Sequence, residues 1–403
     1  MVDFENPFKP GAGHKPPYLA GREEEKDEFL RLLKQSVILE NMVLTGLRGV
    51  GKTVLLDSFK PLAIQNNWLW VGADMSESSS VSEENIAIRL CTDIAIVTSG
   101  LVINREEIRS VGFNAETELV EQTLNYQTLL QIYQSTPGLA LDKLKAVLET
   151  VWAVISSQSE IKGIVLAYDE AQNLSDQASK EQYPLSLLLD AFQSLQKKEL
   201  PLLLLLTGLP TLFPKLVDSR TFSERMFRVV FLASLKEKES REAILKPIKD
   251  NGCPVILSEE SVAAIYKMSG GYPYFIQFIC REVYDAFIQK IDKGENASVP
   301  VNEIERKLDT DFFAGRWSRA TDRQRELLSV VAVLENCNEE FSVQEIVDAS
   351  KESVEKPFSN SHVNQMLTTL SGQGLIFKNR HGKYSFAVPL LGKYIARQQE
   401  VGI

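Results

Sequence analysis

The sequence predicts an α/β fold in which helices cover both faces of a parallel β-sheet, giving three layers. Five short apolar runs alternate with segments of helical pattern, and this alternation is typical of a parallel sheet. Two of the runs end in polar motifs, and ligands bind at the carboxyl ends of the strands in such folds. The expected strands are Met42–Leu44, Trp68–Val71, Ile164–Tyr168, Leu202–Leu206 and Val229–Leu232.

A glycine-rich motif follows the first expected strand directly. Residues 46–53 read GLRGVGKT, fit the pattern G-x-x-x-x-G-K-[ST], and lead into an expected helix. In this motif, backbone N–H groups and the helix N-terminus surround phosphates, Lys52 reaches the β- and γ-phosphates, and Thr53 ligates Mg²⁺. The sequence therefore predicts a P-loop NTPase that binds ATP and Mg²⁺. The expected contacts in the loop are Gly46, Arg48, Gly49, Val50, Gly51, Lys52, Thr53 and Val54.

Two adjacent carboxylates end the third expected strand. Asp169 and Glu170 directly follow the apolar run Ile164–Tyr168, which is the Walker B arrangement. Asp169 would hold Mg²⁺, and Glu170 would polarise the attacking water. With a P-loop upstream, this pair predicts ATP hydrolysis in addition to nucleotide binding.

Composition excludes several classes of protein. The 403 residues allow two or three domains, and the net charge of −10 excludes DNA binding by the molecule as a whole through its overall charge. Four scattered cysteines and three histidines form no metal-site or disulfide pattern, so we expect a reducing, cytoplasmic compartment. The N-terminal residues resemble no secretion signal, and no apolar run is long enough to span a membrane.

The patterns divide the chain into four parts. We expect an extended proline-rich arm over 1–18, a P-loop ATPase core over 19–235, a helical lid over 236–316 and a winged-helix domain over 317–403. The arm is expected to be extended and unpacked. In the core, helices are expected over 19–34, 83–97, 116–158 with a break at Pro137-Gly138, and 184–197; in the lid, over 240–250, 258–268 and 274–291.

Three helices and a hairpin are expected in the last part. Thr321 and Gln324 form a capping box that opens the first helix. This order of elements is typical of a winged helix, a variant of the helix-turn-helix. The expected helices cover 321–334, 343–349 and 361–370, and the expected strands cover 375–377 and 384–386.

The chain resembles AAA+-type P-loop ATPases of the branch that holds origin-recognition initiators and STAND signalling ATPases. The resemblance rests on the two motifs above and on Gly21-Arg22-Glu23, which is similar to a family box that borders the adenine. It implies that Thr207 is the polar sensor at the end of the fourth strand. It also implies that Arg225, with Arg228 as second choice, reaches the γ-phosphate of a neighbouring subunit. A surface salt bridge is the equally weighted alternative for Arg225.

One segment departs from the initiator pattern. Where those proteins carry a second sensor arginine in the lid, this chain has Tyr274. Gly271-Tyr272-Pro273 is instead similar to a STAND motif, in which the proline packs near the base or ribose, so Tyr272 and Pro273 are expected nucleotide contacts. The same three residues also suit a simple turn that opens a helix, and both interpretations are compatible.

The charge of the last domain does not decide whether its partner is DNA or a protein. Residues 317–403 hold ten Lys/Arg and ten Asp/Glu, and the expected third helix carries neither lysine nor arginine. The basic residues gather in the wing, where Lys378, Arg380 and Lys383, with His381 among them, are expected DNA contacts. Protein docking or a purely structural role is the alternative.

Two functions follow from these features. The first is an ATP-binding and ATP-hydrolysing switch that oligomerises and acts on duplex DNA, in a process such as replication, transposition or defence against mobile elements. The alternative is a STAND-like ATP-gated signalling or scaffold protein whose winged helix binds a protein. No membrane partner is expected for either function.

Overall fold

The computed structural model describes residues 5–11, 13–109, 117–158, 160–293, 298–380 and 382–401. Contacts group the chain into two compact units. Unit 1 consists of Met1–Arg22, Gly46–Val54 and Leu232–Ile403, and unit 2 consists of Glu23–Thr45 and Leu55–Phe231. Neither unit is continuous in sequence, because the short segment that holds the P-loop groups with the C-terminal half of the chain.

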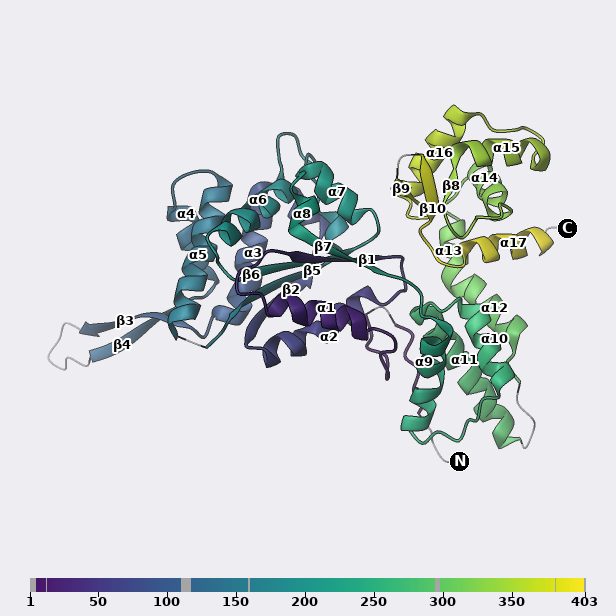
Figure 1. Cartoon of the computed structure of the whole chain (residues 1–403), viewed down its shortest axis with the longest axis horizontal. Helices are drawn as coiled ribbons and strands as arrows, with labels where there is room; N and C mark the ends of the chain where they lie inside the picture. The colour runs from purple at the N-terminus through teal and green to yellow at the C-terminus, as the bar shows by residue number, and fades with distance from the viewer. Residues whose placement is uncertain are drawn as a thin grey trace. The chain divides into compact units, whose positions relative to one another are not determined.

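A five-stranded parallel sheet forms the centre of unit 2, which confirms the predicted α/β P-loop fold (Figure 1). The strand order is β2-β5-β6-β1-β7, so the chain crosses over between strands. In the register, Leu44 of β1 pairs with Thr207 of β6, and Tyr168 of β5 pairs with Leu206. The strands are β1 (Asn41–Gly46), β2 (Trp68–Asp74), β5 (Gly163–Asp169), β6 (Leu202–Gly208) and β7 (Phe227–Leu232).

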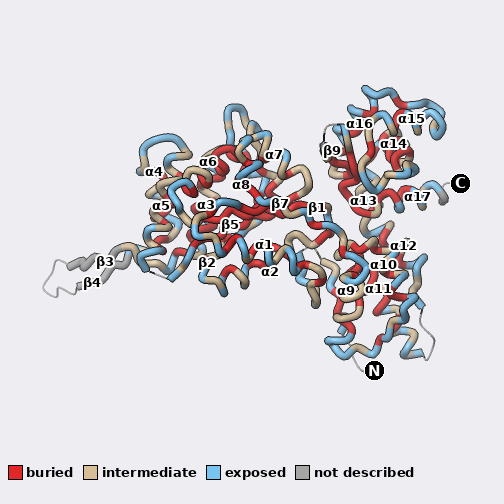
Figure 2. The backbone as a smooth tube through the Cα atoms, viewed as in Figure 1, coloured by how far each residue is buried: buried red, intermediate tan, exposed pale blue. Residues whose placement is uncertain are grey.

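The inner strands are buried along their whole length, as Figure 2 shows. Every residue of β5 and β6 is buried, because helices cover both faces of the sheet. The leucine run of β6 is the sequence signature of that environment. β7 lies at the edge of the sheet, and its Phe231 is 59% exposed.

Two helical layers enclose the sheet. One layer shares a core with Val71 and Tyr168 of the strands. On the other face, Phe29 of α1 stacks on Phe59 of α2 with ring centroids 4.4 Å apart, and Trp70 meets Phe29 edge-on. The first layer contains α3 (Glu83–Thr98), α4 (Tyr126–Ser135), α5 (Ala140–Gln158) and α6 (Pro184–Lys197), and the second contains α1 (Glu23–Leu33) and α2 (Lys52–Gln65); the short helices α7 (Leu212–Ser219) and α8 (Ser223–Met226) follow β6.

The helix expected from residue 116 is wrong in its first part. Residues Thr117–Thr123 form strand β4, which pairs antiparallel with β3 (Val102–Arg109). Helix α4 begins only after Asn125, whose side chain accepts a hydrogen bond from Thr128 N at 3.1 Å. The pairing of β4 with the preceding strand overrides local helix propensity here. The expected break at Pro137-Gly138 is confirmed, because it lies between α4 and α5.

Unit 1 contains the expected lid helices and a helical extension beyond them. The helices are α9 (Glu237–Asp250), α10 (Glu259–Ser269) and α11 (Pro273–Asp292), followed by α12 (Val301–Leu308), the π-helical turn η3 (Asp309–Phe313) and α13 (Ala314–Trp317). The last three elements were not expected. Pro273 stands at the first turn of α11, where proline costs no helix hydrogen bond.

The C-terminal part of unit 1 has the three helices and the hairpin that were expected. The predicted Thr321–Gln324 capping box is confirmed. An unexpected strand β8 completes a three-stranded antiparallel sheet in the order β8-β10-β9. The elements are α14 (Asp322–Ala332), β8 (Phe341–Ser342), α15 (Val343–Ser353), α16 (Asn360–Gly372), β9 (Ile376–Arg380), β10 (Lys383–Phe386) and α17 (Leu391–Val401).

The proline-rich arm is extended but not unpacked, so that part of the expectation is wrong. The Phe8 side chain is only 2% exposed and belongs to the same core as the lid helices. Asn6 Nδ2 donates to the carbonyl of Arg281 at 3.0 Å, and the Tyr18 hydroxyl lies 2.9 Å from Glu242 Oε2. One buried aromatic ring and these polar contacts hold a segment that has no helix or strand of its own.

Candidate nucleotide site

The P-loop has the geometry that phosphate binding requires. Strand β1 ends at Gly46 and helix α2 begins at Lys52, so the loop lies at a helix N-terminus. Gly49 and Gly51 have φ angles of 80° and 89°, which side chains rarely tolerate. A Cβ on Gly51 would meet no other atom within 4 Å, so the space beside the loop is open there. The first N–H groups of α2 lack helical acceptors, and this loop therefore fits an anion.

The Lys52 ammonium is folded over its own loop. Its Nζ donates to the carbonyl oxygens of Gly46 and Leu47 at 2.9 and 3.0 Å. These bonds hold the positive charge beside the open backbone. Thr53, the expected Mg²⁺ ligand, is the second residue of α2.

Arg22 forms a hydrogen bond with the backbone of the P-loop. It is only 5% exposed, and its Nη2 donates to the carbonyls of Val50 and Ala233, both at 3.0 Å. Its neighbour Gly21 has a φ of 60°, and a Cβ there would lie 2.6 Å from the Glu239 side chain. Arg22 therefore fixes the loop backbone, a role that its family box did not indicate.

The start of α11 touches the loop within unit 1. The backbone N–H of Tyr274 donates to the Gly49 carbonyl at 3.1 Å. The preceding turn is fixed by a bond from Leu235 N to the Gly271 carbonyl at 2.8 Å. Tyr272 is partly buried, and burial raises the pKa of its phenol. The turn that carries Tyr272 and Pro273 is thus anchored next to the residue that contacts the loop.

The acidic pair lies where β5 ends. Asp169 is 4% exposed and pairs in register with Asp74, the last residue of β2. Glu170 is exposed and has a φ of 52°, and its backbone N–H donates to Asp169 Oδ1 at 2.8 Å. A non-glycine residue in this region of backbone space is uncommon and marks a constrained turn. The two carboxylates therefore lie in different environments at the end of β5: Asp169 is buried and Glu170 is exposed.

Thr207 lies beside Asp169 at the carboxyl edge of the sheet. The register pairs Tyr168 with Leu206, so the next residues of β5 and β6 are neighbours. Thr207 is fully buried, and its hydroxyl has no hydrogen-bond partner among the described residues. A buried, unpartnered hydroxyl normally costs stability, which is consistent with a polar ligand at this edge.

Gln172 is a site residue that the sequence reading missed. Its Nε2 donates to the Glu170 carboxylate, and its Oε1 accepts a bond from Leu209 N at 3.1 Å. The amide therefore links the acid after β5 to the loop after β6. Nothing in the spacing distinguishes this glutamine from any other polar residue in a loop, so only its contacts reveal the role.

Comparison with known families agrees with this geometry. Residues 18–217 match the family described as "AAA ATPase domain". This segment, which carries the P-loop and the acidic pair after β5, is therefore similar to AAA-type ATPase domains. Residues 310–395 match a second family, described as "Domain of unknown function (DUF8462)". No curated protein matches the sequence.

Solved structures have a fold similar to that of this chain. A Walker-type ATPase of Pyrococcus abyssi is similar with a TM-score of 0.57 and 16% identity, over 94% of this chain and 96% of that one. The ORC2 protein of Aeropyrum pernix in its ADP form is similar with a TM-score of 0.51 and 14% identity, over 97% of this chain and 96% of that one. At these identities the likeness concerns the fold alone.

Arg225 lies where the edge strand β7 begins, whereas the P-loop follows the carboxyl end of β1. It belongs to α8, just before β7, and Asn41 Nδ2 at the start of β1 lies 3.4 Å from the Met226 carbonyl. Arg225 is exposed, forms no ion pair with any described residue, and lines a cavity of about 390 Å³ at this edge. Arg228 instead pairs with Glu28, which raises the pKa of the guanidinium.

The predicted basic wing is partly neutralised. Lys378 is exposed, but Lys383 Nζ lies 3.4 Å from Glu345 Oε2, and Asn379 donates to Glu340 at 3.1 Å. The Arg380 side chain and all of His381 lie outside the described residues. The exposed face of α16 carries no Asp, Glu, Lys or Arg; it presents Ser361, His362, Asn364, Gln365, Thr368 and Thr369.

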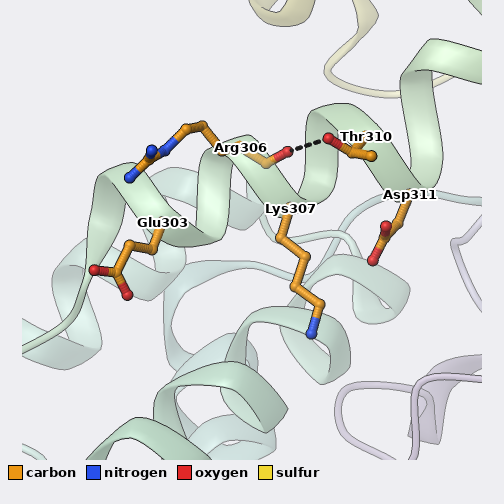
Figure 3. Close-up of a pocket in the computed structure, with 5 residues that line it drawn as sticks. All are labelled: Glu303, Arg306, Lys307, Thr310 and Asp311. Carbon is orange, nitrogen blue, oxygen red and sulfur yellow. Dashed lines mark hydrogen bonds between the residues drawn. The ribbon is translucent and has the colours of Figure 1, made fainter.

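A second cavity, of about 330 Å³, lies on α12 and η3 (Figure 3). It is lined by Glu303, Arg306, Lys307, Thr310 and Asp311. Thr310 donates to the Arg306 carbonyl at 3.0 Å, and Lys307 pairs with Glu282 at 2.7 Å. The cavity is a polar surface groove of mixed charge, lined by residues outside the nucleotide motifs.

The described residues contain no cluster of His, Cys, Asp and Glu suited to a metal ion. No described helix combines the length and apolar character that a membrane crossing requires.

Proposed function

We propose that this chain binds ATP with Mg²⁺ and hydrolyses the γ-phosphate bond. The observation that carries the proposal is the P-loop, whose glycines turn the backbone at the start of α2. Thr53 and Asp169 would ligate Mg²⁺, which neutralises phosphate charge when bound. Glu170 would hold and polarise the attacking water, and Thr207 would donate its unpartnered hydroxyl. We further propose that Gly21, Tyr272 and Pro273 border the base or ribose.

The substitution Lys52→Ala tests this proposal. Removing the ammonium should weaken ATP binding by about tenfold or more, because a charge-assisted hydrogen bond to a phosphate is lost. Binding is measured by titrating a fluorescent ATP analogue. Lys60→Ala, on the exposed side of the same helix, is the matched control and should bind as the parent does. Equal affinity in Lys52→Ala would contradict the assignment.

We also propose that the active form is an oligomer. Arg225 lies at the sheet edge away from the strand end that carries the P-loop, and no described acid pairs with it. An arginine so placed suits the nucleotide of a neighbouring copy better than its own. We propose that the chain divides into an ATPase core over 19–235, a lid over 236–316 and a final domain over 317–403.

For the final domain, we propose a winged helix that contacts duplex DNA through Lys378, Arg380 and Lys383. Three helices followed by a hairpin support this proposal. The second candidate is a protein partner, favoured by the Lys383–Glu345 ion pair and by the uncharged face of α16. Phosphate binding depends on unpaired cations, so this neutralisation weakens the case for DNA.

A filter-binding titration with duplex DNA, with and without ATP, separates the two candidates. If DNA is the partner, retention should rise with ATP, fall steeply with salt, and weaken in Lys378→Glu. Lys351→Glu, exposed on α15 and away from the wing, is the control. Absence of retention at low salt in both nucleotide states would favour the protein partner.

A further inference from the structure

Three arginines gather on one side of the P-loop within unit 1. They are Arg48 in the loop, Arg316 in α13 and Arg319 just after it. Burial lowers the pKa of Arg316, and the charges of Arg48 and then Arg319 lower it further. A Cβ placed on Gly374 would lie 3.7 Å from Arg48 Nη2, so this side chain also reaches the turn between α16 and β9.

No described carboxylate pairs with these guanidinium groups. Arg48, Arg316 and Arg319 form no ion pair in the described part of the chain, whereas Arg323 and Arg325 nearby each pair with an acid. Like charges held together without acids destabilise a fold, and an anionic ligand offsets that repulsion. The cluster therefore has the charge of a site for an anion.

Arg316 is held in place by aromatic rings. Its guanidinium carbon lies 4.1 Å from the centre of the Phe312 ring, and it donates to the Phe312 carbonyl. The Tyr274 ring lies 5.3 Å from the same Phe312 ring, and the Tyr274 N–H bonds to Gly49 of the loop. The chain of contacts Arg316–Phe312–Tyr274–Gly49 thus fixes a cation beside the phosphate-binding backbone.

We propose that Arg316, assisted by Arg48, binds the terminal phosphate of a nucleoside triphosphate and so distinguishes the triphosphate from the diphosphate. The inference rests on the proposed ATP function. In the lid position where related initiators carry an arginine, this chain has Tyr274, which has no positive charge. Arg316 supplies that charge from a helix about forty residues later in the sequence and packs against the ring of Tyr274 through Phe312. Only a nucleoside triphosphate has the terminal phosphate, which is the additional anionic group that would reach Arg316.

The test compares two nucleotides on the full-length protein. Affinities for a non-hydrolysable ATP analogue and for ADP, both with Mg²⁺, are measured by displacement of a fluorescent nucleotide. Arg316→Gln should weaken the ATP analogue about tenfold or more and change ADP by less than about twofold. Arg316→Lys should recover part of the loss because it restores the charge. Arg48→Gln, an exposed substitution, should show the same selectivity and serves if Arg316→Gln does not fold.

Arg323→Gln is the matched control. Arg323 also stacks on an aromatic ring, with its guanidinium carbon 3.8 Å from the centre of Phe358, but it pairs with an acid, Glu326. It should bind both nucleotides as the parent does. The inference is wrong if Arg316→Gln and Arg48→Gln weaken both nucleotides equally or weaken neither. If Lys52→Ala still weakens the binding of both nucleotides, the proposed ATP function is unaffected by that result. A parent that binds neither nucleotide would overturn the proposed function as well.

Discussion

Glu170 stands in a left-handed backbone conformation directly after the buried carboxylate of Asp169. The turn moves its side chain out of the strand, and Gln172 holds the carboxylate through a hydrogen bond. A base held in this way can orient a water molecule in the transition state without adding to nucleotide binding. Binding and hydrolysis should therefore separate at this residue.

We expect Glu170→Gln to bind ATP within about twofold of the parent and to lose at least about 100-fold in turnover, because general-base catalysis contributes that much. Phosphate release and nucleotide binding are measured on the same preparation. Glu181→Gln is a close control, since Glu181 is an exposed glutamate with a φ of 59° in the same unit. Unchanged turnover in Glu170→Gln would remove this residue from the mechanism.

At the residue scale, the sequence predicts which residues carry the chemistry better than it predicts which residues contact one another. The motifs identify Lys52, Asp169 and Glu170 because their spacing is fixed by the local turn. They do not identify Gln172 or Arg316, whose partners lie in other elements. The role of Arg22 was also not predictable, because its bond to the loop depends on how distant segments pack.

Asn41 joins several elements of the sheet unit through one buried amide. Its Oδ1 accepts bonds from Gln196 Nε2 and Leu204 N, both at 2.8 Å, and its Nδ2 lies 3.1 Å from Gln196 Oε1. These bonds connect the start of β1 to α6 and β6. Asn41 is fully buried, so bulk water does not reach the groups that it bonds.

We expect Asn41→Ala to lower the free energy of unfolding by about 2–4 kcal/mol, since it leaves buried polar groups of Gln196 and Leu204 unsatisfied. Denaturant unfolding followed by tryptophan fluorescence measures the change. Asn364→Ala, at an exposed position on α16, should shift stability by less than about 0.5 kcal/mol. A midpoint that does not move in Asn41→Ala would show that the amide network carries little stability.

At the scale of elements, burial explains which predictions succeeded. The inner strands were predictable because both of their faces are covered, so they appear as uninterrupted apolar runs such as Leu202–Leu206. Strands β3 and β4 were not, because they pair with each other as an antiparallel hairpin outside the five-stranded sheet and lack a long apolar run. The short strand β8 and helix α17 were missed because each depends on contacts distant in sequence: β8 pairs with β10, and Tyr394 of α17 stacks on Phe313.

For the whole molecule, the position of Arg225 predicts cooperation between copies. Arg225→Ala should bind ATP as the parent does and hydrolyse it more slowly, on the order of 10³-fold if the residue acts as an arginine finger. Arg228→Ala is the comparison, because its guanidinium already pairs with Glu28 and it should keep most of its turnover.

Mixing experiments decide whether Arg225 of one subunit acts at the nucleotide of another subunit. Arg225→Ala and Glu170→Gln subunits, each inactive alone, should recover part of the activity when mixed, because some sites then receive an intact residue of each kind. Turnover per subunit in the parent should also rise with protein concentration. No recovery on mixing, with turnover independent of concentration, would indicate a monomeric enzyme.

The grouping of Gly46–Val54 with the C-terminal half of the chain has a consequence for biosynthesis. A ribosome completes every strand of the sheet before it makes Tyr274, whose N–H bonds to Gly49. The nascent P-loop therefore has no lid contact during much of translation, and closing a long loop between distant segments slows folding. Nucleotide present in the cell at that stage would meet a loop that only the N-terminal part of the chain supports, through the bond from Arg22 to Val50.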